Sequence, residues 1–121
     1  MPSPAQHVFR TIETHHDKIY LRLKRRQQAE THELQLWILN SLGEPVQASG
    51  MGLIEPDLVT FQTEAEDGTG EFIMMSAAHC NVTFKVVKSQ GKPRKVGFSL
   101  NDGVPDEGEK AMSPVGLDPL P

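Results

Sequence analysis

Two turn signals, each beside residues that alternate between apolar and polar, constrain the fold of this chain most. The first lies within Leu39 to Val46 (LNSLGEPV), and the second within Asp67 to Phe72 (DGTGEF). Turns at such intervals between short alternating segments are typical of antiparallel sheets that pack as a sandwich. We therefore expect an all-β domain built as an antiparallel β-sandwich.

The alternation predicts about seven strands between residues 18 and 100. The first begins at Lys18, where Ile19, Leu21 and Leu23 share one face of a strand with period two. Further alternating segments cover residues 32–40, 58–64, 71–76, 82–86 and 96–100, and residues 46–57 are expected to bridge between two sheets. A chain of 121 residues has room for one such domain, which we place at residues 18–102.

The two ends of the chain depart from this pattern. Ser3 followed by Pro4 is typical of a helix start, so residues 1–17 are predicted to form a short helix or an extended arm. Either form leaves apolar side chains in this segment that need a surface to cover. Residues 103–121 are rich in Pro, Gly and acidic residues, with few bulky apolar ones, and are predicted to be a disordered acidic tail.

The arrangement of turns and strands resembles the bacterial immunoglobulin-like domains of the invasin and intimin type. The residues that carry the resemblance are Asn40 to Val46, Asp67 to Gly70, Ser76, and the segment Val82 to Val86 (VTFKV). The resemblance covers about two thirds of the chain and implies an immunoglobulin-like sandwich. Members of this family act as spacers and adhesive modules on bacterial surfaces, and similar domains decorate phage capsids and tails.

Three departures from the surface type favour a phage virion accessory protein. The chain holds one such domain rather than a tandem array, shows no signal peptide, and starts with Met1. The expectation is a non-enzymatic capsid decoration or tail protein that is made in the host cytoplasm and located in the virion. Its partners are then other structural proteins, and the alternative is an adhesion module for carbohydrates or cell surfaces.

Charged residues of each sign are grouped along the sequence. A basic group lies early, an acidic stretch from Glu44 to Glu71 contains no basic residue, and a second basic group runs from Lys85 to Lys95. These groups either meet on neighbouring strands of one molecule or form complementary patches in a repeating assembly, including a homo-oligomer. The predicted partner-binding residues combine the apolar N-terminal set with the early basic group: Val8, Phe9, Ile12, Arg22, Lys24, Arg25 and Arg26.

One string resembles a catalytic signature. Ser76 to Cys80 (SAAHC) matches the histidine motif of chymotrypsin-like serine proteases, in which the Cys forms a disulfide and the His serves a distant Ser. Cys80 is the one cysteine of the chain, and no Gly-Asp-Ser-Gly motif follows. We therefore expect no catalytic residues, and we interpret Ala77 and Ala78 as small residues that let two strands turn closely.

The remaining motifs predict no cofactor, metal, nucleic acid or membrane as partner. Adjacent histidines such as His15 and His16 point apart on a strand, whereas a structural zinc site needs four converging ligands. The net charge of −4 gives no reason to expect nucleic acid, and no apolar run is long enough for a bilayer. A host-surface glycan would need an aromatic platform, for which Trp37 and Tyr20 are the candidates.

Overall fold

The N-terminal segment forms a helix that is longer than the sequence predicts. The computed structural model describes residues 2–65 and 67–100, and it begins with α1 (Pro4–Arg25). Ser3 caps this helix, since its Oγ accepts the backbone N–H of Gln6 at 3.1 Å. The predicted helix start is therefore confirmed, but the helix continues eight residues past residue 17.

The strand predicted from Lys18 to Lys24 is wrong, because these residues form the last two turns of α1. The alternation of Ile19, Leu21 and Leu23 suggests one shared face, yet Leu23 is buried and Leu21 is 46% exposed. The burial follows a helical spacing instead, with basic residues in the last turn that favour the helix C-terminus. The buried residues of α1 are Ala5, Phe9, Ile12, His16 and Leu23.

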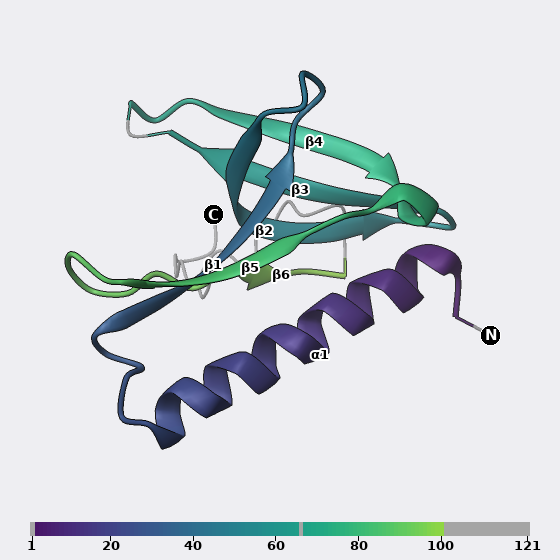
Figure 1. Ribbon diagram of the computed structural model, residues 1–121. Helices are drawn as coiled ribbons and strands as arrows, with labels where there is room; N and C mark the ends of the chain where they lie inside the picture. The colour runs from purple at the N-terminus through teal and green to yellow at the C-terminus, as the bar shows by residue number, and fades with distance from the viewer. Residues whose placement is uncertain (1, 66, 101–121) are drawn as a thin grey trace, which may run out of the picture.

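The rest of the described chain is one antiparallel sheet with a sixth, parallel strand, as Figure 1 shows. Its strands are β1 (His32–Leu39), β2 (Pro45–Ile54), β3 (Leu58–Glu64), β4 (Gly70–Ser76), β5 (Thr83–Lys88) and β6 (Gly97–Phe98). The spatial order is β4-β3-β2-β1-β5, and the short β6 runs parallel to β2 beside Gly50 and Met51. The expectation of a mostly antiparallel β fold is confirmed, whereas the predicted bridge at residues 46–57 is wrong because most of it is β2.

Both turn signals connect neighbouring strands, as the sequence predicts. Between β1 and β2, the Asn40 side chain accepts the backbone N–H groups of Leu42 and Glu44, each at 2.9 Å, and Gly43 adopts a φ of +78°. Between β3 and β4, Gly68 adopts a φ of +88°. The acidic tail predicted at 103–121 lies outside the described residues.

Helix α1 covers one face of the sheet, and the core lies between them (Figure 1). Phe9 is 1% exposed, and its ring meets the ring of Phe98 edge to face, with 5.8 Å between centroids. On the sheet side the core is made by alternate residues of β1, β2 and β3, including Leu36, Met51 and Phe61, each completely buried. We call this the helix face of the sheet and the opposite side the outer face.

Truncation of Phe9 tests this packing. Replacing Phe9 by Ala leaves a cavity between α1 and the sheet, so the free energy of unfolding should fall by about 3–5 kcal/mol. The neighbouring Arg10 is exposed, and Arg10→Ala should change stability by less than about 0.5 kcal/mol. Chemical denaturation followed by circular dichroism measures both values, and equal stability of the two variants would contradict the packing described.

Candidate functional site

The predicted partner-binding residues divide into two groups in the structure. Phe9 and Ile12 are buried in the core, and Val8 packs half-buried against it. The surface that these side chains need to cover is therefore supplied by the sheet of the same chain. The four basic residues are exposed at the C-terminal end of α1: Arg22, Lys24, Arg25 and Arg26.

A connected set of polar contacts runs along the outer face of β1. Gln35 donates to Glu33 Oε2 at 2.9 Å, and the Trp37 indole N–H donates to Gln35 Oε1 at 2.8 Å. The Lys85 ammonium of β5 lies over the Trp37 ring, 4.2 Å from the centroid. At the other end Arg94 joins the set, since its backbone N–H donates to Glu33 Oε1 at 3.0 Å. These contacts fix the outer face of β1 from end to end.

The pairing of Glu33 with Arg94 perturbs the carboxyl group. Burial of Glu33 alone would raise its pKa, but the backbone N–H of Arg94, the Gln35 amide and the Arg94 charge outweigh burial and hold the pKa below its usual value. The Arg94 guanidinium lies 3.5 Å from Glu33 Oε2 and is itself largely exposed. This contact joins positions 61 residues apart and anchors the segment that precedes β6.

The two outermost strands differ in charge and both expose apolar side chains. Within residues 2–65 and 67–100, β4 pairs with β3 alone and β5 with β1 alone. Strand β4 exposes Phe72 and Met74 on the outer face and carries Glu71. Strand β5 carries Lys85 and Lys88 and no acidic residue. Each edge therefore presents unpaired backbone groups that suit a further strand.

The acidic turn beside β4 is held in its charged form. Asp67 accepts the Thr69 hydroxyl at 2.6 Å and the Thr69 backbone N–H at 3.0 Å. These hydrogen bonds hold the pKa of Asp67 below its usual value, the hydroxyl contributing most. Glu64 is exposed close by at the end of β3.

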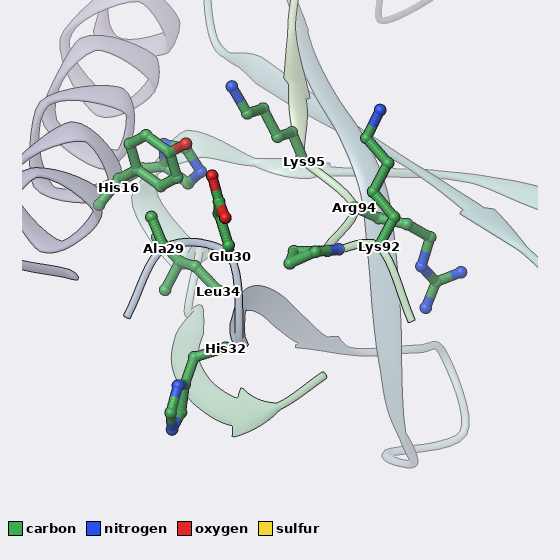
Figure 2. A pocket seen from close by; sticks show the side chains of 10 residues that line it. His16, Ala29, Glu30, His32, Leu34, Lys92, Arg94 and Lys95 are labelled. Carbon is green, nitrogen blue, oxygen red and sulfur yellow. The ribbon is translucent and has the colours of Figure 1, made fainter. Parts of the chain in front are cut away.

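A cavity of about 360 Å³ lies between α1, the start of β1 and the segment Lys92–Lys95. Figure 2 shows His16 on the helix side of this cavity and Lys92 and Lys95 on the opposite side, while the Arg94 guanidinium points away from the helix. Lys95 also lies over the Tyr20 ring, with 5.0 Å between its Nζ and the centroid. The cavity thus combines aromatic rings with two lysines.

The protease-like string forms the connection between β4 and β5. Ala77 to His79 make a short 3₁₀ turn, η1, which Ser76 caps by accepting the Ala78 N–H at 3.2 Å. The interpretation of this string as a strand connection is confirmed, and Ala77 is buried in the core. Burial raises the pKa of the Cys80 thiol to about 11, so this thiol is a poor nucleophile near neutral pH.

The other residues considered from the sequence are spread over separate surfaces. Trp37 lies on the outer face of β1, whereas Tyr20 projects from α1 on the helix side, so the two rings form no common platform. His15 is exposed and His16 is buried on α1. Among the residues that the structure describes, no group of three or more His, Cys, Asp or Glu side chains is placed to hold a metal ion.

Comparison of the chain with protein-family models, with curated proteins and with solved structures finds no match. The resemblance to immunoglobulin-like domains therefore depends on the turn and strand residues alone. In the described part of the chain, no helix combines the length and apolar character that a bilayer crossing requires.

The Glu33 contact makes stability depend on pH. Because the folded-state pKa of Glu33 is lowered, its contribution is present above the usual carboxyl pKa and is lost as the pH falls through the folded-state value. Glu33→Gln should lower the free energy of unfolding at pH 7 by about 1–2 kcal/mol. The deficit should shrink below about pH 4, as measured by denaturation at several pH values.

The matched control is Glu64→Gln on the exposed end of β3, which should stay within about 0.5 kcal/mol of the parent at every pH. A Glu33→Gln deficit that is the same at pH 7 and at low pH would show that the charge of Glu33 contributes nothing.

Proposed function

We propose that the protein is a non-enzymatic interaction module that assembles edge to edge with further copies of itself. The observation that carries this proposal is the pair of strands that, in the described part of the chain, have a free edge at opposite ends of the sheet order: β4 with Glu71 and β5 with Lys85 and Lys88. A free strand gains main-chain hydrogen bonds from an added strand, and the side chains determine which strand is accepted. In this protein, the acidic edge at β4 and the basic edge at β5 belong to the same chain.

Strands β4 and β5 run in the same direction, because four antiparallel pairings separate them in the sheet order. Ile73 pairs with the core residue Phe61 and Val86 pairs with Leu34, so both belong to the helix face. A parallel pairing of β4 of one copy with β5 of the next therefore keeps the helix faces of both copies on one side, with Ile73 beside Val86 and the outer-face residue Phe72 beside Lys85. Every position in this register then meets a residue on its own side.

The contact is of the head-to-tail type, because each copy uses two different edges. Such contacts generate a ring when the rotation between copies closes and a filament when it does not. The acidic residues Glu64 and Asp67 lie beside the β4 edge, and the β5 edge is basic. Opposite charge at the two edges favours this pairing over β4 with β4 or β5 with β5.

A virion is the setting that we propose for this assembly, as a capsid decoration or tail protein. The support comes from the immunoglobulin-like turn residues at Asn40 to Val46 and Asp67 to Gly70, which are similar to those of phage decoration domains. Edge-to-edge repetition also suits a protein that must cover a repeating surface. The finer description of the fold as an immunoglobulin-like sandwich belongs to this proposal.

Reversal of one charge at each edge tests the assembly. Glu71→Lys alone and Lys88→Glu alone bring like charges to the two edges that meet, so each should shift the chain toward monomer. The chain with both substitutions restores an opposite pair and should recover the mass of the parent assembly. Size-exclusion chromatography with light scattering measures the mass across a range of protein concentrations.

The control is Lys18→Glu, which makes the same charge change on the exposed surface of α1 and should leave the mass unchanged. A parent chain that stays monomeric at every concentration would refute the proposal. So would single charge reversals that behave like the parent.

A further inference from the structure

We propose that the cavity between α1 and the segment Lys92–Lys95 binds a small planar anion, an aromatic ring that carries a carboxylate. This inference is independent of the edge-to-edge assembly. The cavity measures about 360 Å³, which is near the lower end of the range of ligand pockets, about 300–1,000 Å³. A ligand with one ring fits this volume, whereas a dinucleotide or a peptide does not.

One wall is a fixed aromatic surface. His16 is 8% exposed, and its ring meets the ring of Phe98 at 5.1 Å between centroids and the ring of Phe84 at 6.1 Å. Packing on these two rings holds the imidazole in place. Leu34, Ala29 and Pro93 complete the apolar lining, so a planar ring would be enclosed by apolar and aromatic groups.

The opposite side supplies positive charge. Lys92 and Lys95 line the cavity, and Figure 2 shows both on the side away from His16. The charge of Arg94 is directed to Glu33, which leaves the two lysines for a ligand. Among the described residues that line the cavity, Glu30 is the one carboxylate, so this part of the lining has a net positive charge. A carboxylate is therefore preferred to a neutral ring.

The basic side of the cavity is held in position on both flanks. The Arg94 backbone N–H is bonded to Glu33 Oε1, and Val96 is buried in the core. Lys95 lies over the Tyr20 ring, 5.0 Å from its centroid. Across the cavity, the loop with Ala29 is tied to the end of α1, because Gln28 N–H donates to the carbonyl of Leu23 at 2.8 Å. Binding needs little rearrangement of either side, which favours affinity.

Titration of the isotope-labelled full chain with three probes tests this site. Benzoate carries both ring and charge, benzamide carries the ring alone, and inorganic phosphate carries charge alone. We expect benzoate to shift the NMR signals of His16, Tyr20 and Ala29 in a saturable way. Benzamide and phosphate should bind there about threefold to tenfold more weakly, since each lacks one of the two contacts.

Two variants separate the contributions of charge and space. Lys92→Gln combined with Lys95→Gln should weaken benzoate binding about threefold to tenfold, and Ala29→Leu should weaken it by filling the cavity without changing any charge. The matched control is Lys18→Gln with Lys24→Gln, which removes two exposed lysines of α1 outside the cavity and should leave binding unchanged.

Heteronuclear spectra of each variant show whether it keeps the fold before titration. Benzoate shifts spread over many lysines, or an equal loss of binding in the control variant, would overturn the proposal. So would binding of phosphate as tight as that of benzoate, because the aromatic wall would then have no role.

Discussion

The contact between α1 and the sheet is the interaction on which the rest of the structure depends. Phe9 and Ile12 occupy the same core as Leu36, Met51 and Phe61, so the helix face of the sheet is closed by the chain itself. This closure buries Phe9 and Ile12, which are therefore not available to a partner. It also leaves the strand edges, the outer face and the two ends of α1 as the surfaces that a partner can reach.

The contact between Glu33 and Arg94 positions the segment that carries the lysines of the cavity. It fixes Arg94 to Glu33 of β1, and β6 lies three residues further on and pairs with β2. The same segment carries Lys92 and Lys95 to the cavity beside α1. The buried carboxylate of Glu33 therefore helps to position both β6 and the two lysines on the basic side of the cavity.

The sequence predicts the parts of this fold that depend on local chemistry. The Asn40 and Gly43 turn and the Asp67 and Gly68 turn are recognisable because their hydrogen bonds and positive φ angles involve neighbouring residues. The helix was recognisable at Ser3 for the same reason.

The extent of α1 and the site were not predictable in this way. Ile19 and Leu23 fit a strand and a helix equally, and His16 is a polar residue that nevertheless continues the buried stripe against Phe98. The contact of Glu33 with Arg94 has no local signal, because 61 residues separate the two positions. The free edges β4 and β5 follow from the strand order, which is set by pairing across the whole chain.

Hydrogen exchange of the full chain at low and high protein concentration tests the central claim most directly. If copies join through their edges, backbone amides of β4 and β5 should gain protection as the concentration rises, while those of α1 and β2 keep the same protection. Protection that rises on α1 instead, or that does not depend on concentration in either edge strand, would contradict the account.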